Sequence, residues 1–157
     1  MKTFKSMSDF ADHLIGLAAE AKVVVNHLAD EAAAKVEKIA KAEIGHYQPA
    51  VGPFRKWEDL ADSTEFDKIN KGFPVDAPLL RTGELRASIE RTVSGNEAAI
   101  GSNDKRMEYH ELGTVRIPPR AVLGPAAIRA NKDMQPRFAL TIAAWLGGRA
   151  WRRPRLK

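Results

Sequence analysis

A histidine followed directly by a glutamate, His110 and Glu111, is the pair in this chain that most resembles a catalytic or metal-binding motif. In helical zinc sites such a pair needs a second histidine four residues after the first, so that both imidazoles lie on one helix face. Position 114 is Thr, and Gly113 would already have ended the helix. The histidines at positions 13, 27 and 46 are not at ligand spacing, and cysteine is absent. The sequence therefore predicts no metal site.

Other catalytic patterns are missing as well. The serines at positions 88, 94 and 102 lack the flanking glycines of a nucleophile elbow. The glycines at 83, 95 and 101 form neither a phosphate-binding loop nor a dinucleotide fingerprint. We therefore expect no catalytic residue, no cofactor and no enzymatic activity.

Positive charge is concentrated at the C-terminal end of the chain. Six Arg or Lys residues follow Asp133, the last acidic residue, and they exceed the formal net charge of +5 by one, so residues 1–133 sum to −1. The basic tail, residues 149–157, has three interpretations: a solvated tail, an anchor for a protein partner, or a contact with nucleic acid through phosphate binding and base stacking. The residues that would make such contacts are Trp151, Arg152, Arg153 and Arg155.

The N-terminal part of the chain has the periodicity of a long amphipathic helix over residues 8–43. Apolar residues recur every three or four positions from Phe10 to Ile39, and Gly45 is a natural stop. The apolar stripe is narrow and partly Ala, so we expect some of it to pack against another helix or another subunit. The alternative is a helix broken once near Asn26.

The rest of the chain predicts a small α+β core. A long loop region, residues 45–78, holds one helical piece around 63–71. Residues 79–148 hold a β-hairpin, with strands over 85–93 and 97–101 and a turn at Gly95, followed by a helix over 107–112. Because each residue before a proline is excluded from helical geometry, residues 116–120 should be extended. A last helix should open near Pro125, restart or kink at Pro136, and pack on the sheet.

The chain is expected to be a single domain of 157 residues, with neither a signal peptide nor a membrane span. Four of its phrases, WEDLADST, LLRTGELRASI, AAIGSN and YHELGTVRIPPRAVL, occur in that order between about residues 55 and 125. Together they resemble the Mu-type virion morphogenesis proteins and the wider group of tail-completion and head–tail connector (neck) proteins of tailed bacteriophages. The resemblance rests on Trp57, Leu80, Thr82, Gly83, Leu85, Ser88, Ile89, Ile100, Gly101, Ser102, Tyr109, His110, Glu111, Gly113, Thr114, Pro118, Pro119 and Arg120.

The resemblance implies a structural virion protein rather than an enzyme. It implies a homo-oligomeric ring of six or twelve copies at the head–tail junction, made in the host bacterial cytoplasm. Its partners would be a neck or head-closure protein and tail-tube or tail-terminator subunits, with non-specific contact to DNA in the channel. The segment of Arg116, Ile117, Pro118, Pro119 and Arg120 is expected to be a stiff arm that docks on a partner. The alternative function is a nucleic-acid-binding accessory protein that acts through the Arg-rich tail.

Overall fold

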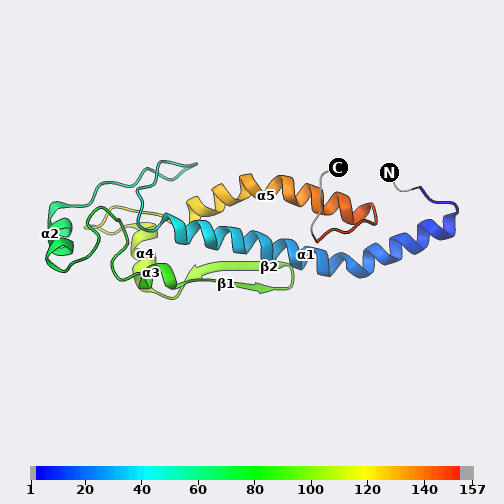
Figure 1. The fold of residues 1–157 in the computed structure, drawn as a ribbon, viewed down its shortest axis with the longest axis horizontal. Helices are drawn as coiled ribbons and strands as arrows, with labels where there is room; N and C mark the ends of the chain where they lie inside the picture. Colours follow the sequence, from blue (N-terminus) through cyan, green and yellow to red (C-terminus); the bar gives the residue numbers. More distant parts are fainter. Residues whose placement is uncertain (1–2, 153–157) are drawn as a thin grey trace.

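The computed structural model describes residues 3–152 and has the predicted α+β architecture (Figure 1). Two long helices and a hairpin lie side by side, and three short helices gather at one end of an elongated molecule. The elements are α1 (Met7–Glu43), α2 (Asp62–Asn70), α3 (Glu84–Ala87), β1 (Ile89–Ser94), β2 (Glu97–Ser102), α4 (Lys105–Leu112) and α5 (Leu123–Leu146).

Helix α1 is one continuous helix of 37 residues, so the alternative with a break near Asn26 is wrong. The side chain of Ser6 caps its first turn by accepting a hydrogen bond from the N–H of Asp9, at 3.0 Å. The helix ends at Glu43, and two residues later Gly45 has a φ of 101°, which favours glycine. At 1.5 Å per residue α1 is about 55 Å long, and this length makes the molecule elongated.

The hairpin forms the only sheet among residues 3–152. Ile89 pairs with Ser102 and Ser94 with Glu97, and Gly95 provides the turn with a φ of 61°. The predicted strand over 85–93 begins too early, because Glu84–Ala87 is a single helical turn that starts after Gly83. Leu85 and Ile89 are both buried, so their four-residue spacing belongs to the change from helix to strand.

The C-terminal helix α5 runs from Leu123 to Leu146 without interruption, so the predicted restart at Pro136 is wrong. Pro136 is exposed inside the helix, whereas Pro125 lies in the first turn, where its missing N–H costs no intrahelical bond. The helix ends before Gly147 and Gly148, as predicted.

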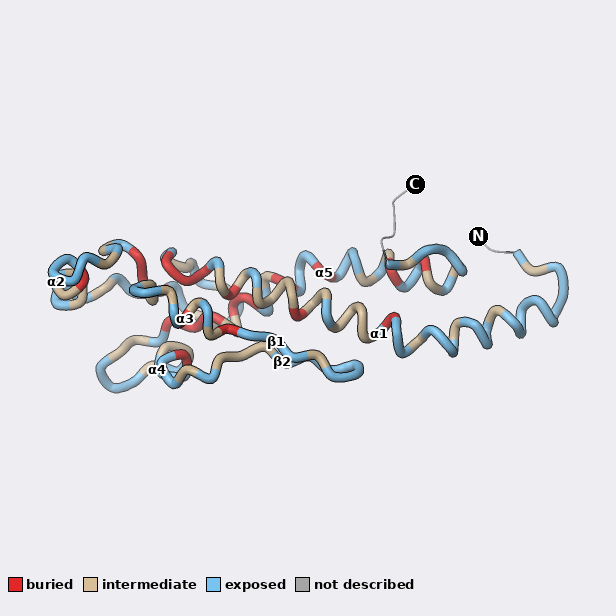
Figure 2. Tube along the Cα trace, turned by 60° about the horizontal axis from the view of Figure 1, so that its bottom comes forward, coloured by how far each residue is buried: buried red, intermediate tan, exposed pale blue. Residues whose placement is uncertain are grey.

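Helix α1 is the central element of the molecule. It lies along α5 on one side and along both strands of the hairpin on the other (Figure 1). A cluster of buried residues lies near the C-terminal end of α1, where the loops and short helices join the two long helices, and further buried residues follow the contact between α1 and α5 (Figure 2). This core consists of Ala40, Ile44, Trp57, Leu85, Ile89, Met107, Val122 and Ala126. The N-terminal part of α1 extends past the hairpin and carries no residue of this core.

Candidate functional site

The four sequence phrases meet at the end of the molecule that holds α2, α3 and α4. Trp57 is 4% exposed in the core, and its indole N–H donates to the backbone carbonyl of Ala121 at 3.0 Å. This bond joins the first phrase to the last. Leu85 and Ile89, from the second phrase, pack in the same core. Residues far apart in the sequence therefore form one structural unit.

Ser88 and Ser102 connect the open end of the hairpin to α4. Their hydroxyl oxygens are 2.7 Å apart, and the hydroxyl of Ser88 also donates to the carbonyl of Leu85 at 2.9 Å. Ser102 Oγ accepts the backbone N–H of Asp104, the N-cap of α4, at 3.0 Å. These bonds fix the direction in which α4 leaves the sheet. The two serines therefore have a positioning role.

Glu111 caps the N-terminus of α5. Its Oε1 accepts the backbone N–H groups of Val122 and Leu123 at 2.7 and 2.5 Å. Val122, the N-cap residue, makes no side-chain cap of its own, so the carboxylate is supplied by α4. Among residues 3–152 no group of His, Asp and Glu could hold a metal ion. The carboxylate that suggested chemistry therefore stabilises a helix end.

His110 lies in the wall of a cleft, and its imidazole has a buried Nδ1 without a hydrogen-bond partner among the described residues. Burial, followed by the charges of Arg120 and Arg106, lowers the pKa of His110 from its ordinary value of 6.5. The ring is therefore neutral at pH 7, and it contributes no positive charge to the cleft.

Residues 113–117 form a closed turn. Gly113 has a φ of 75°, and a Cβ at this position would come within 3.0 Å of the backbone nitrogen of Pro119. The N–H of Thr114 donates to the carbonyl of Ile117 at 2.8 Å, and Thr114 Oγ1 accepts the N–H of Ile117 at 3.1 Å. Arg116 is exposed near the tip of this turn. The expected extended arm over residues 116–120 is therefore corrected to a turn followed by a segment without regular secondary structure.

Arg120 is fixed inside the fold, contrary to the expectation of an arm residue. It is 6% exposed, and its guanidinium donates to the carbonyls of Glu58 and Asp59, with its Nη2 at 3.0 Å from each. Its own N–H donates to the carbonyl of His110 at 2.7 Å. Arg120 thus holds the loop around residue 58 against the end of α4.

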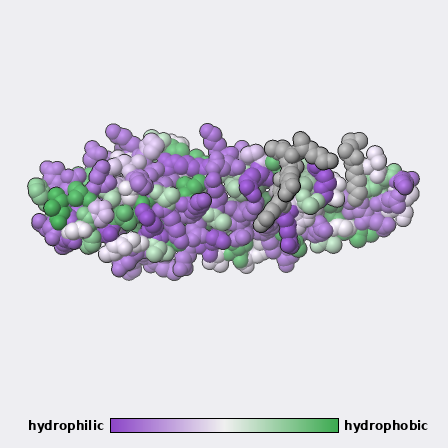
Figure 3. Space-filling view, in the orientation of Figure 1, coloured by the Kyte–Doolittle hydropathy of each residue, from purple (hydrophilic) through white to green (hydrophobic). Residues whose placement is uncertain are grey.

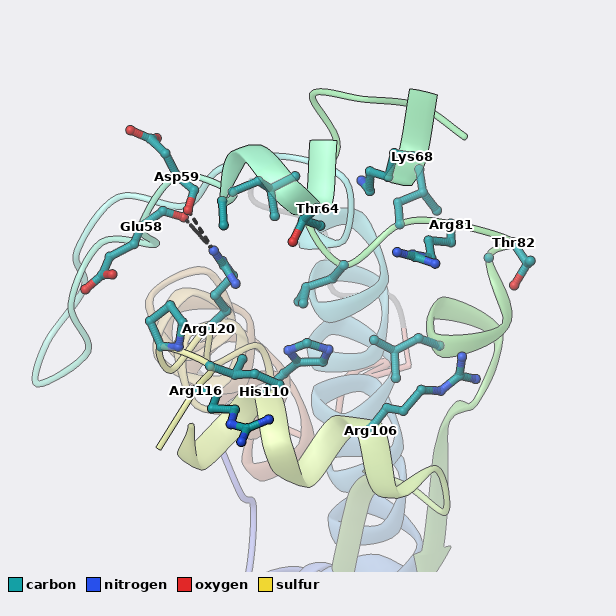
Figure 4. Close-up of a pocket in the computed structure, with 18 residues that line it drawn as sticks. Glu58, Asp59, Thr64, Lys68, Arg81, Thr82, Arg106, His110, Arg116 and Arg120 are labelled. Carbon is teal, nitrogen blue, oxygen red and sulfur yellow. Dashed lines mark hydrogen bonds between the residues drawn. The ribbon is translucent and has the colours of Figure 1, made fainter. Parts of the chain in front are cut away.

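These elements enclose a cleft of about 480 Å³, which we call the basic cleft (Figure 4). It lies between α2, α3, α4 and the turn over 113–117. Its walls combine apolar side chains with five Lys or Arg residues, whereas the side chains of Glu58 and Asp59 point away from it. The walls are formed mainly by Leu60, Thr64, Lys68, Leu79, Leu80, Arg81, Thr82, Gly83, Leu85, Arg106, His110, Arg116, Ile117, Pro118 and Arg120.

The cations of the basic cleft divide into two groups. Arg81 is paired with Asp67, and Arg106 is paired with Asp104 and Glu84, so their charges are neutralised locally. The other cations, Lys68, Arg116 and Arg120, have no carboxylate partner in the part of the chain that the structure describes. The cleft therefore holds three cations that no ion pair among the described residues neutralises, and two of them, Lys68 and Arg120, are bonded to backbone carbonyls.

Lys68 contributes the most deeply buried of these charges. It is 2% exposed, and its ammonium donates to the carbonyls of Pro74 and Ala77 at 3.0 and 2.5 Å. Burial lowers the pKa of Lys68, the positive charge of Arg81 lowers it further, and the charges of Asp76 and Glu65 oppose this shift only in part. Nothing in the sequence indicates this role, because a lysine in a polar nine-residue helix is ordinarily exposed.

The start of the basic tail packs against α1. Trp151 donates its indole N–H to the carboxylate of Glu20 at 3.2 Å, and its ring lies 5.4 Å from that of His27. The guanidinium of Arg152 stacks over the same indole ring, 5.5 Å from its centroid. Arg153 and Arg155, predicted contact residues of the tail, lie outside the described residues.

Hydrophobic side chains reach the surface at both ends of the molecule (Figure 3). At one end α2 exposes Phe66 and Ile69. At the other end the first turns of α1 expose Met7, Leu14 and Ile15. Between residues 3 and 152 no helix is both long and apolar enough to cross a membrane.

Comparisons with known proteins add no assignment. No protein-family model, curated protein or solved structure matches the chain.

Proposed function

We propose that this protein is a structural subunit of a bacteriophage neck, where it forms a ring that completes the tail or joins it to the DNA-filled head. Other copies of the chain would surround it in the ring. A neck or head-closure protein would lie on one side, and tail-tube or tail-terminator subunits on the other. The protein would be made in the host cytoplasm and would act without catalysis.

The observation that carries the proposal is the structural use of the residues behind the resemblance. Glu111 caps α5, Trp57 joins two distant loops, and Ser88 with Ser102 fixes α4 on the hairpin. A set of side chains used for internal positioning fits a scaffold subunit better than an enzyme, whose polar groups converge on a reacting atom.

The shape of the molecule supports the same function. A closed ring of identical subunits needs two different contact surfaces on each subunit. The elongated fold exposes apolar side chains on α1 at one end and has an apolar, positively charged cleft at the other. These two surfaces differ in chemistry and lie far apart, as a head-to-tail contact requires.

The nucleic-acid-binding alternative has less support among the described residues. Base stacking by the tail would need a free aromatic face, whereas the ring of Trp151 contacts His27 and is covered by Arg152. The indole N–H is also bonded to Glu20. The single aromatic residue in the tail sequence, Trp151, is therefore used to hold the start of the tail against α1.

The proposal is tested by deleting the gene from the phage that encodes it and restoring it on a plasmid. We expect DNA-filled heads beside unattached tails in electron micrographs of the deletion, and joined particles after complementation. Mass spectrometry of purified wild-type virions should detect the chain at six or twelve copies per particle. Infectious, joined particles in its absence, or virions that lack the chain, would refute the proposal.

A further inference from the structure

The hairpin of β1 and β2 has two open edges, which are a second pair of contact surfaces besides the two ends of the molecule. One face of the hairpin lies on α1, because Ile89 and Ile100 pack with the core and the guanidinium of Arg91 bonds to Asp30 and Glu37 of α1. No third strand lies beside either edge in the part of the chain that the structure describes. Strand β1 lies at the border of the molecule in Figure 1, and β2 does so in Figure 2. Each outer edge is therefore open to the solvent.

The backbone groups along both edges are unpaired. Only Gly95 and Asn96 separate Ser94 from Glu97, so this closing pair exchanges two hydrogen bonds, and bonded pairs follow at every second position of the hairpin. The residues between the bonded pairs point their N–H and C=O groups outwards. They are Arg91 and Val93 on β1 and Ala98 and Ile100 on β2. No hydrogen bond joins these outward groups to any other group of the described residues.

The hairpin lacks the prolines and bulges that protect many edge strands from pairing with another chain. Its register is continuous, and neither strand contains proline. Strand β2 has no charged residue from Ala98 to Ser102. On β1 the guanidinium of Arg91 is bonded to two carboxylates of α1, so Glu90 is the one charge of that strand without a partner among the described residues. Both edges are therefore able to accept another strand.

The chain itself supplies a matching strand for each edge. If β1 of a second copy lies beside β2 in the register of the hairpin itself, the outward groups of the two strands face one another and exchange hydrogen bonds. Neither glutamate of the hairpin then meets a like charge, because Glu90 faces Gly101 and Glu97 faces Ser94. Pairing of β2 with β2 would leave both β1 edges open, and so would a strand from a different protein. Pairing of β2 with β1 uses every edge.

We propose that β2 of one copy of this chain pairs with β1 of the next copy, so that the hairpins of a ring form one continuous antiparallel sheet. Because neighbouring copies in a ring are related by rotation, β1 of the next copy nearly keeps the direction of β1 and runs antiparallel to β2. The contact joins two different edges, and closing the ring leaves no edge open. The inference rests on the proposed ring and identifies the surfaces along which it closes.

The chain has no cysteine, so disulfide formation between full-length variants with one cysteine each tests the contact directly. Ala99→Cys places a thiol on the outer face of β2, and Glu90→Cys, Thr92→Cys and Ser94→Cys place one along β1; all four side chains are exposed. On mild oxidation Ala99→Cys should form a disulfide-linked heterodimer with one of the three β1 variants, which is Thr92→Cys in the register of the hairpin itself. No variant should crosslink alone. Arg55→Cys, in an exposed loop, is the control and should not crosslink with Ala99→Cys.

A second variant blocks the β2 edge without removing a hydrogen bond of the hairpin. Ala98→Pro deletes the outward N–H of Ala98 and leaves the bonded pair of Thr92 and Ala99 intact. Sedimentation velocity should show multimers of the wild-type chain and association at least roughly 10-fold weaker for Ala98→Pro, the effect of losing one good contact. The matched control Ala98→Ser keeps the N–H and should associate as the wild type does. Circular dichroism and urea unfolding check that Ala98→Pro folds; if it does not, the crosslinking result decides.

Three results would overturn the inference: a monomeric wild-type chain, no heterodimer of Ala99→Cys with any β1 variant, or efficient crosslinking of Ala99→Cys with itself, which would show that like edges pair. Failure of the proposed function has a different signature. If folded Ala98→Pro still gives joined heads and tails in the complementation experiment, the strand contact is wrong while the neck assignment stands. If the chain is absent from virions but the heterodimers form, the strand contact is right and the neck assignment is wrong.

Discussion

Replacing Glu111 should destabilise the fold through the N-terminus of α5. In Glu111→Ala the backbone N–H groups of Val122 and Leu123 lose their acceptor. Val122 is fully buried, so water replaces the carboxylate poorly. A buried N–H left without an acceptor costs about 1–3 kcal/mol, and a lost helix cap typically costs about 1 kcal/mol. Because the two effects overlap, we expect a loss of about 2–3 kcal/mol for Glu111→Ala.

The variant Glu111→Gln separates geometry from charge. Its amide oxygen can still accept the two N–H groups, but the favourable interaction of a negative charge with the helix dipole is lost, so we expect a cost of about 1 kcal/mol. Glu108→Ala is the matched control, because Glu108 lies on the same short helix with its side chain exposed. It should change the free energy of unfolding by less than about 0.5 kcal/mol.

The assay is urea unfolding followed by circular dichroism, at high salt and at two protein concentrations, because self-association would add to apparent stability. For a domain of this size the loss in Glu111→Ala corresponds to a fall in melting temperature of roughly 5–10 °C. Hydrogen exchange should accelerate most at the first turn of α5. If Glu111→Ala is as stable as Glu108→Ala, the carboxylate is not the cap, and the structural interpretation of the His-Glu pair fails.

Two further predictions concern the same end of the molecule. Gly113→Val should cost about 2–4 kcal/mol, because a β-branched residue at positive φ is strained and its Cβ would press on Pro119. Gly72 has a similar positive φ of 69° with open space around it, so Gly72→Val should cost less; equal losses in urea unfolding would show that the contact with Pro119 is unimportant. Burial and the charge of Arg120 lower the pKa of His110 from 6.5, so the unfolded chain takes up its proton first. The free energy of unfolding should therefore fall as pH drops below about 6.5, more steeply than in His110→Gln; parallel pH profiles would contradict this.

The sequence predicted the elements whose signals are local. The three- and four-residue recurrence over α1 and the Gly95 turn of the hairpin each depend on neighbours within a few positions, and both predictions are confirmed. The prediction that the first strand begins at residue 85, which is wrong, had the same local basis. Apolar residues at 85, 87 and 89 fit an alternating strand, but Gly83 at positive φ starts a helical turn that uses the four-residue spacing of Leu85 and Ile89. The two-residue period of a strand and the four-residue spacing of a helical turn both fit residues 85–89. The packing of Leu85 and Ile89 in the core favours the helical turn.

The basic cleft could not be predicted, because its residues come from segments whose contacts are long-range. Arg120 meets carbonyls about 60 positions away, and Glu111 caps a helix that begins 12 positions later. The prolines at 118 and 119 exclude helical geometry for the residues before them. They do not indicate which backbone carbonyls the side chain of Arg120 will reach. The composition states how many Lys and Arg residues the chain has. It does not indicate which of them have no carboxylate as an ion-pair partner in the folded protein.

Arg116 and Arg120 show how long-range contacts give two similar residues different roles. They lie four residues apart, and sequence analysis assigned both to one docking arm. The bonds of Arg120 to two backbone carbonyls hold the loop around Glu58 against α4, which fixes one wall of the cleft. The turn closed by Thr114 and Ile117 then leaves Arg116 exposed at the rim. A change at Arg120 must therefore alter both folding and any contact made by the cleft, whereas a change at Arg116 can alter the contact alone.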